Sequence, residues 1–367
     1  MNKKNLGQFY TTNYKYILQN MHIPDNVSNI IEPFAGNGDL LNFIEDSANA
    51  NANANANAKA DANAIYNVKC YDIDPKKDFV IKQDTLLNPP DLDDAFVITN
   101  PPYLARNKSS DKSVFNKYNT NDLYKCFLQI LINSKCLGGI IIIPLNFLCS
   151  IRKADIELRE NFVKKYDMNI INIFEEQVFD DTSYSICCFQ FTAKNDTSEN
   201  ISDCYIYPSN KRISFVLNTD NNYTIGGKIY NLEKNAKYKI DRATEAAGAI
   251  RENDEFCTNI LVKCIDDNID SKIGLFIVDD MTRNKYIDKT PNLTARSYAI
   301  LVIEPKITLE EQEELVKKFN IYLNKKRDKY NSLFLTNYRE NNTIARKRIS
   351  FGLVYDICNY LLYNKII

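Results

Sequence analysis

The sequence lacks the patterns that mark several large classes of protein. It contains ten cysteines but no CxxC pair and a single histidine, His22, so no metal-ligand spacing is present. The first residues, MNKKNLGQFYTT, contain no apolar stretch of the kind that a signal peptide needs. The most apolar run, 137–148, is too short to span a membrane and is interrupted by Pro144. These absences favour a reduced, intracellular protein, cytoplasmic or in a host cell if the chain is viral, with no metal and no membrane contact.

Charge is unevenly distributed along the chain, although the net charge is only -1. Residues 1–100 contain eight Lys or Arg against thirteen Asp or Glu, whereas residues 321–367 contain nine against three. A near-neutral chain does not simply coat nucleic acid. The basic rear suits contact with an anionic polymer, and it suits a solvated basic helix equally well.

The length of 367 residues predicts two domains. Over residues 1–195, apolar β-branched runs alternate with helical patterns, which predicts an α/β domain with a mainly parallel, seven-stranded sheet. Residues 196–367 are richer in Asn, Asp, Lys and Ser, which predicts a separate mixed α/β domain. The predicted strands are 27–31, 68–71, 79–82, 95–99, 139–143, 170–174 and 184–191, the last two forming an antiparallel pair at one edge. The predicted helices are 13–22, 122–134, 308–325 with Thr308 as its N-cap, and 349–363.

A low-complexity segment separates the first predicted helix after the Gly-containing turn from the second strand. Residues 47–64 alternate Asn with Ala and offer no apolar side to bury. The segment is expected to be a mobile surface insertion or a frayed extension of the preceding helix. We assign it no function.

Polar motifs follow four of the predicted strands. They are EPFAGNGDL at 32–40, YDIDP at 71–75, KQD at 82–84 and NPPY at 100–103. Because ligands of doubly wound sheets bind at the carboxyl ends of the strands, these motifs predict one shared site. The Gly turn is neither GxGxxG nor a P-loop, so no pyrophosphate is required. Asp72 suits a ribose diol in any nucleotide-binding domain of this kind, and on its own it equally suits a cap on the next helix.

The tetrapeptide Asn100-Pro101-Pro102-Tyr103 has properties that suit chemistry on an aromatic amine. An amide oxygen and a backbone carbonyl can accept both amine hydrogens, which keeps the nitrogen lone pair out of the ring. Two prolines hold those acceptors in place before a substrate arrives. The following tyrosine offers a face on which a planar base can stack. A Pro-rich turn with an Asn cap is the alternative.

The order of these motifs resembles a known family. GQFYTT, EPFAGNGDL, YDIDP, KQD and NPPY, followed by a long variable domain, are similar to the gamma class of S-adenosylmethionine-dependent DNA adenine-N6 methyltransferases, over residues 7–191. The resemblance implies a Rossmann-like methyltransferase fold for residues 1–195 and S-adenosylmethionine as the cofactor. It implies a site-specific, adenine-specific DNA methyltransferase that acts on a flipped-out base of double-stranded DNA. Residues 196–367 would be the target-recognition domain.

The resemblance also implies a role for individual residues. Those expected around the cofactor are Tyr10, Thr11 and Thr12 over its methionine part, Glu32, Pro33, Ala35, Gly36, Asn37 and Gly38 in the surrounding loop, Asp72 at the ribose, Ile73 and Asp84 at the adenine, and Asn100 at the methyl-transfer end. Those expected at the target are Asn100 and Pro101 on the amine, Pro102 as the rigid support, and Tyr103 and Phe179 on the two faces of the base. For Phe179, a core aromatic is an equally good interpretation.

Basic residues are candidates for contact with DNA phosphates. They are Arg106, Lys108 and Lys112, just after NPPY, and Arg346, Lys347 and Arg348 near the end of the chain. The first group lies in a polar stretch, 104–121, that is either a loop closing on DNA or a disordered insertion. No nuclease motif is present, so a restriction endonuclease partner would be a separate protein. The alternatives are methylation of RNA adenine or of a protein glutamine amide, and an inactive nucleic-acid-binding protein with the same fold.

Overall fold

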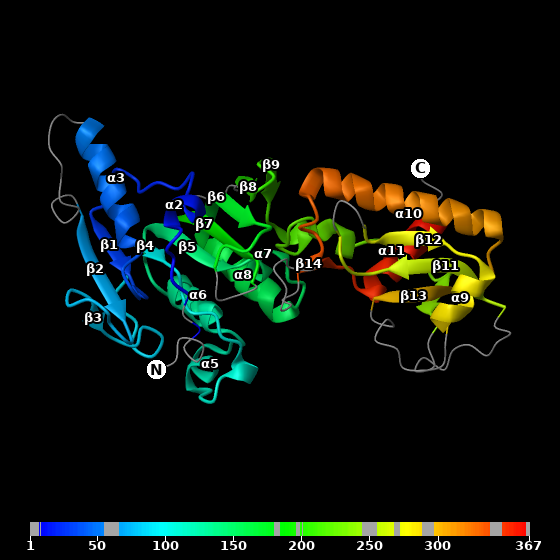
Figure 1. Cartoon of the computed structure of the whole chain (residues 1–367), viewed down its shortest axis with the longest axis horizontal. Helices are drawn as coiled ribbons and strands as arrows, with labels where there is room; N and C mark the ends of the chain where they lie inside the picture. Colours follow the sequence, from blue (N-terminus) through cyan, green and yellow to red (C-terminus); the bar gives the residue numbers. More distant parts are fainter. Residues whose placement is uncertain are drawn as a thin grey trace. The chain divides into compact units, whose positions relative to one another are not determined.

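The protein is described by a computed structural model that covers residues 7, 9–54, 66–179, 184–195, 199, 201–243, 255–267, 272–287, 297–337 and 347–364, without the side chains of 50–54. The chain divides into two compact units, the first ending at Asn218 and the second beginning at Thr219 (Figure 1). The boundary predicted from the sequence lies earlier, at residue 195. Each unit is described by itself.

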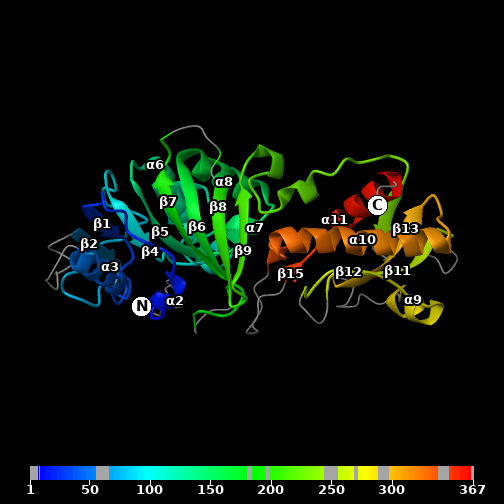
Figure 2. The same cartoon turned by 90° about the horizontal axis from the view of Figure 1, so that it is seen from above.

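The first unit is built on one nine-stranded sheet with the order β3-β2-β1-β4-β5-β7-β6-β8-β9 (Figure 2). Strand β7 runs antiparallel to both of its neighbours and β9 runs antiparallel to β8, whereas the other neighbouring pairs are parallel. The strands are β1 (Asn29–Glu32), β2 (Asn67–Asp72), β3 (Ile81–Lys82), β4 (Phe96–Thr99), β5 (Gly138–Pro144), β6 (Tyr166–Phe174), β7 (Ile186–Ala193), β8 (Ile201–Tyr207) and β9 (Lys211–Val216).

The prediction of seven strands was wrong, since the sheet is mixed and contains nine. Strands β8 and β9 extend it beyond β6, so the antiparallel pair β6 and β7 is not at an edge as expected. The central strand β5 is buried at every residue, but β9 alternates between buried and exposed positions. A strand with one solvated face carries polar side chains such as Lys211 and Ser214. Its composition therefore resembled that of the second domain.

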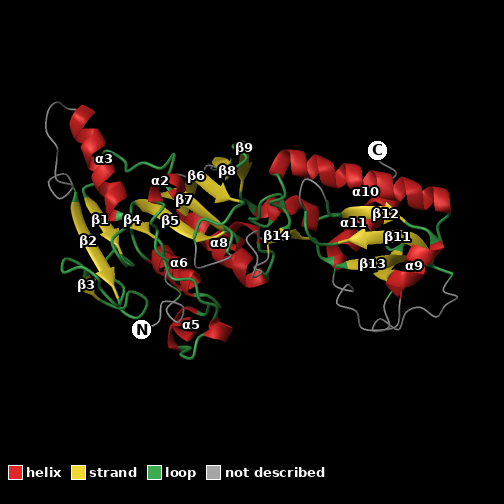
Figure 3. Ribbon diagram, viewed as in Figure 1, coloured by secondary structure: helices red, strands yellow, loops and turns green. Residues whose placement is uncertain are grey.

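Helices connect and cover the parallel strands (Figure 3). They are α2 (Tyr14–Ile17), α3 (Leu41–Ala54), η1 (Arg106–Lys108), α5 (Ser113–Tyr118), α6 (Leu123–Asn133), α7 (Asn146–Cys149) and α8 (Lys153–Lys165). Helix α6 packs against α8 and carries an apolar buried face. Helix α3 continues into the Asn-Ala repeat as far as Ala54, which agrees with the expectation that the repeat extends the preceding helix. The remainder of 47–64 lies outside the described residues.

The second unit has a four-stranded antiparallel sheet with the order β10-β13-β11-β12. Helix α10 packs against β12, β11 and α11, and its buried residues Leu315, Phe319 and Leu323 join the core. The predicted N-cap is confirmed: Glu311 N–H donates to Thr308 Oγ1 over 3.2 Å, and Thr308 N–H donates to Glu311 Oε2 over 2.8 Å. The elements are η2 (Thr219–Asn221), η3 (Gly227–Tyr230), β10 (Lys239–Arg242), β11 (Cys257–Lys263), β12 (Gly274–Ile277), α9 (Asp280–Ile287), β13 (Tyr298–Glu304), α10 (Leu309–Tyr330), β14 (Thr336–Asn337), β15 (Lys347–Arg348) and α11 (Phe351–Asn364).

In the described part of the chain, no helix is long and apolar enough to cross a membrane. Within the same residues, no three His, Cys, Asp or Glu side chains come together in a way that could hold a metal ion.

Candidate active site

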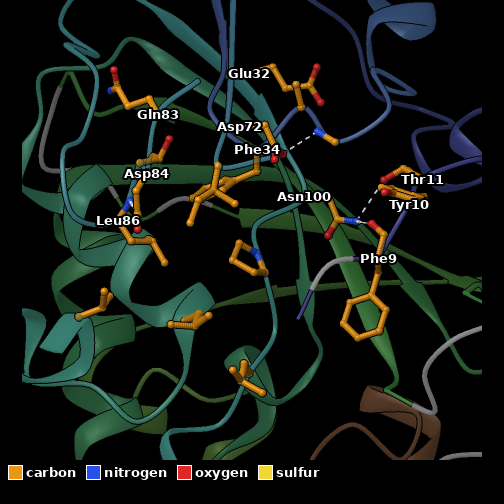
Figure 4. Close-up of a pocket in the computed structure, with 18 of the residues that line it drawn as sticks. Phe9, Tyr10, Thr11, Glu32, Phe34, Asp72, Gln83, Asp84, Leu86 and Asn100 are labelled. Carbon is orange, nitrogen blue, oxygen red and sulfur yellow. Dashed lines mark hydrogen bonds between the residues drawn. The ribbon is translucent and has the colours of Figure 1, made fainter. Parts of the chain in front are cut away.

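The first unit has a pocket at the carboxyl ends of its parallel strands. The strand order reverses between β1 and β4, and such a reversal leaves a crevice in which ligands of doubly wound sheets bind. Glu32 ends β1, Asp72 ends β2 and Asn100 follows β4, and all three line one cavity of about 500 Å³ (Figure 4). The convergence of strand-end motifs that the sequence predicts is therefore present.

The predicted residues divide into those that line the pocket and those that do not. Lining residues are Tyr10, Thr11, Glu32, Ala35, Gly36, Asp72, Ile73, Asp84, Asn100 and Pro102. The lining does not include Thr12, Pro33, Asn37, Gly38, Pro101, Tyr103 or Phe179. Among the latter, Thr12 and Asn37 are exposed, and the carbonyl of Pro33 accepts a hydrogen bond from Thr85 Oγ1 over 2.7 Å.

Glu32 is a buried carboxylic acid that faces this pocket. Its residue is only 1% exposed, and its Oε2 has no hydrogen-bond partner among the described residues. Burial raises the pKa of Glu32 well above its usual value, and the nearby carboxylates of Asp39 and Asp72 raise it further. A cationic group entering the pocket would relieve this cost, because it would supply both a donor and an opposite charge.

Asp72 shapes the glycine-containing loop. Its Oδ2 accepts a hydrogen bond from Gly36 N–H, and its Oδ1 accepts one from Asp74 N–H, each over 2.8 Å. Gly36 has a φ of 52°, and a Cβ there would lie 3.1 Å from the ring of Tyr10. The two hydrogen bonds to Asp72 therefore fix the conformation of the loop beside the pocket, and Asp72 itself forms part of the pocket wall.

Asp84 lies two residues after the end of β3. Its Oδ1 accepts hydrogen bonds from the N–H groups of Leu86 and Leu87, over 3.0 and 3.1 Å. The carboxylate is therefore fixed by one oxygen while the residue lines the pocket. Ile73, which is 37% exposed, lines the same cavity and offers an apolar surface there.

The side-chain amide of Asn100 is tied to the N-terminal segment. Its Nδ2 donates to the carbonyl of Phe9 over 2.9 Å and to Thr11 Oγ1 over 3.1 Å. Its Oδ1 accepts a hydrogen bond from the hydroxyl of Tyr103, which also points at the carbonyl of Ile142 over 2.8 Å. Burial raises the pKa of Tyr103 well above its usual value, so this hydroxyl stays protonated and can donate to one of the two acceptors at a time.

Three aromatic rings stack beside Asn100. The ring of Phe9 lies 5.3 Å from that of Tyr103 and 6.1 Å from that of Phe179, between centroids, with interplanar angles of 28° and 26°. Tyr103 and Phe179 are 2% and 5% exposed, whereas Phe9 is partly exposed. The two rings expected to face a base therefore both contact Phe9.

The sequence did not single out several residues that line the pocket. Phe34, within EPFAGNGDL, packs edge-on against Phe127 at 5.0 Å and was available from the motif. Phe9 was available in the same way from GQFYTT. The segment after NPPY is ordered, containing η1 and α5, and contributes Ser109, Ser110, Asp111, Val114 and Phe115 to the wall. Its place just after NPPY indicated a loop closing on DNA, but its composition did not indicate that these five residues line the pocket.

The candidate DNA-binding cations lie in three settings. Lys108 is exposed in η1. Two others are bonded within their own segment, since Arg106 donates to Asn116 Oδ1 over 2.6 Å and Lys112 donates to the carbonyls of Arg106 and Ser109. Lys347 and Arg348 form the short strand β15 in the second unit and are partly buried. Arg346 lies outside the described residues.

Comparison with protein families gives one match. Residues 17–179, less than half of the chain, match the family model of the Eco57I restriction-modification methylases. No curated protein shows significant sequence similarity to the chain.

Several solved structures show partial similarity to the chain. A modification subunit assigned to a type I restriction enzyme of Vibrio vulnificus YJ016 is 14% identical with a TM-score of 0.41, over 55% of this chain and 47% of that one. A type I restriction-modification methyltransferase subunit from Streptococcus thermophilus is 13% identical with a TM-score of 0.36, over 55% and 47%. The M protein of the type I enzyme EcoKI is 12% identical with a TM-score of 0.38, over 92% and 66%. The chain thus spans about half the length of the first two.

Proposed function

We propose that this chain is a DNA methyltransferase that transfers the methyl group of S-adenosylmethionine to the N6 amine of a flipped-out adenine in double-stranded DNA. The observation that carries the proposal is the position of Asn100. This acceptor amide lines the same cavity as Asp72 and Asp84, so a group that orients an amine and two acids suited to an adenosine share one site. The family match over residues 17–179 supports a methylase of a restriction-modification system.

The residues present fit the proposed cofactor. The cavity of about 500 Å³ is of the size that holds a drug-sized ligand. The unpartnered Oε2 of Glu32 suits the ammonium of its methionine part, and the apolar surface of Ile73 suits the adenine. Asp72 and Asp84 would accept hydrogen bonds from the ribose and from the cofactor's own amine. When bound, the cofactor supplies an electrophilic methyl group on a sulfonium.

The chain's own residues would then orient the nucleophile. The Oδ1 of Asn100 and the carbonyl of Pro101 would accept the two hydrogens of the target amine and direct its lone pair at the methyl group. This requires no covalent link to the protein. Since the rate would come from positioning and from the electrostatics around the amine, loss of the Asn100 amide should be far more harmful to turnover than to cofactor binding. A partner endonuclease would be a separate chain.

The test uses methyl-labelled S-adenosylmethionine and unmethylated genomic DNA, which is then digested to nucleosides. We expect label in N6-methyldeoxyadenosine with the wild type and loss of about 100-fold or more with Asn100→Ala, because one positioned acceptor is worth this much. Asn133→Ala, on the exposed end of α6, is the matched control and should retain full activity. RNA and protein are offered in parallel reactions, and label in RNA or in protein glutamine instead of DNA would replace the proposed substrate. Absence of label from all three would support the inactive binding protein.

A further inference from the structure

Phe9 fills the space that the proposed function requires for the target base. Its ring is stacked with that of Tyr103 and with that of Phe179, at 5.3 and 6.1 Å between centroids, whereas among the described residues Tyr103 and Phe179 make no ring contact with each other. A flipped base held between two aromatic faces needs a gap one ring thick. Here that gap is already occupied by a ring of the protein itself.

The segment that carries Phe9 also holds the acceptor amide. Asn100 Nδ2 donates two hydrogen bonds to this segment, one to the carbonyl of Phe9 and one to Thr11 Oγ1. Tyr103 is bound to the same segment, since its N–H donates to the carbonyl of Gly7 over 2.9 Å. Departure of the Phe9 ring would thus empty the gap while Asn100 keeps its hydrogen bond to Thr11.

Of the three stacked rings, Phe9 is the one that can leave. Tyr103 is fixed by its backbone bond and by its buried hydroxyl, and Phe179 is buried as well. Phe9 is partly exposed, and within the described part of the chain one hydrogen bond, from Asn100 Nδ2 to its carbonyl, holds it here besides the stacking. Stacking between two aromatic rings is a modest interaction, and an incoming base can replace it with stacking of its own.

We propose that Phe9 is a placeholder for the target base: it keeps Tyr103 and Phe179 apart in the free protein, and a planar base displaces it. This rests on the proposed function, in which Tyr103 and Phe179 receive that base. Phe9 is a positioning residue of the free state and takes no part in methyl transfer.

The direct test places 4-fluorophenylalanine at position 9 and follows its fluorine resonance. The probe is adenosine, added after sinefungin has saturated the cofactor pocket. We expect the resonance to move from its stacked position toward that of the free amino acid as adenosine binds. In parallel, Phe9→Ala should bind adenosine about ten-fold more tightly than the wild type, because no ring has to be displaced. Phe276→Ala, which removes an exposed ring of β12 that does not line the pocket, should give no such gain.

Each other outcome is decisive. A resonance that stays in place at saturating adenosine, or an adenosine affinity that is not increased in Phe9→Ala, overturns the placeholder role even if the wild type forms N6-methyldeoxyadenosine. A displaced resonance in a protein that does not methylate DNA supports the placeholder role and rejects DNA adenine as the substrate. Absence of adenosine binding in both proteins overturns the placeholder role as well.

Discussion

The backbone N–H of Tyr103 donates to the carbonyl oxygen of Gly7 over 2.9 Å, joining the first and the last of the motifs at the pocket. Gly7 has a φ of 67°, and a Cβ there would lie 2.7 Å from the carbonyl oxygen of Tyr103. A backbone atom at that distance cannot be avoided by rotating a side chain. The N-terminal segment can therefore lie against NPPY only if position 7 is glycine.

The first prediction concerns Gly7→Ala. A left-handed alanine costs about 1–2 kcal/mol before any clash is counted, so S-adenosylmethionine affinity and methyl transfer should each fall about ten-fold or more. The midpoint of thermal unfolding should change little, because only the segment over the pocket is displaced. Isothermal titration and a thermal melt measure the two effects. Gly352→Ala is the matched control, since a Cβ there meets nothing within 4 Å. Equal loss of binding in both variants would reject the explanation.

The position of the motifs could be predicted from the sequence because the strands that precede them are short, apolar and followed at once by polar residues. Val97 and Ile98 make β4 fully buried, and Asn100 must then emerge at its carboxyl end. Four residues predicted in this way line one pocket: Glu32, Asp72, Asp84 and Asn100.

Two features could not be predicted, for physical reasons. Strand β9 is the edge of the sheet, and in both β8 and β9 buried residues alternate with more exposed ones, so these strands lack the apolar run by which the central strands were recognised. The place of Phe9 depends on a long-range choice among several aromatic rings that could fill the gap beside Tyr103. Local sequence does not encode which one does, and the stack was therefore found only from the structure.

The second prediction concerns Glu32→Gln and its dependence on pH. The pKa of Glu32 is raised in the folded protein by burial and by two neighbouring carboxylates, so the folded state binds more protons than the unfolded state. Its contribution to stability is then greatest below the unfolded pKa and is lost as the pH rises through the folded pKa. The free energy of unfolding of the variant should exceed that of the wild type by a margin that grows with pH.

Urea unfolding of the variant and the wild type at several pH values measures this difference in free energy. The titration of other groups affects both proteins equally and cancels in the difference. The same variant should bind S-adenosylmethionine about ten-fold less tightly, because a charge-assisted bond to the cofactor ammonium becomes a neutral one. Asp39→Asn separates the two roles, since it removes only a neighbouring charge. A stability difference that shrinks with rising pH would show that Glu32 is charged in the free protein.

The third prediction concerns the buried ion pair between Lys125 on α6 and Asp155 on α8. Their charged atoms lie 2.5 Å apart, the side chains are 10% and 8% exposed, and Asp155 also accepts from Ser150 Oγ over 2.6 Å. Asp155→Ala should lower the free energy of unfolding by about 3–5 kcal/mol, because it leaves the ammonium buried without an opposite charge, with the neutral Asn121 Oδ1 as its remaining side-chain acceptor among the described residues. The double replacement Lys125→Met with Asp155→Leu should restore most of it.

A matched exposed pair lies on the same helix. Lys153 and Glu157 are 3.8 Å apart with side chains 92% and 56% exposed, and Glu157→Ala should change the free energy of unfolding by less than about 0.5 kcal/mol. Denaturant titration of the four proteins measures both differences. A similar small loss for Asp155→Ala would mean that water or a neighbouring group compensates Lys125.

The fourth prediction concerns Lys108, an exposed cation of η1 in the segment that forms part of the pocket wall. If this residue binds a DNA phosphate, Lys108→Ala should weaken DNA binding at low salt by a few-fold and reduce the slope of log affinity against log salt by about 0.9. S-adenosylmethionine affinity should be unchanged, since the side chain does not line the pocket. Lys153→Ala, which removes another exposed lysine, from α8, is the control and should leave the slope as it is. Because counterion release depends on the number of phosphates contacted and not on overall charge, a slope reduced equally by both variants would place the DNA elsewhere on the protein.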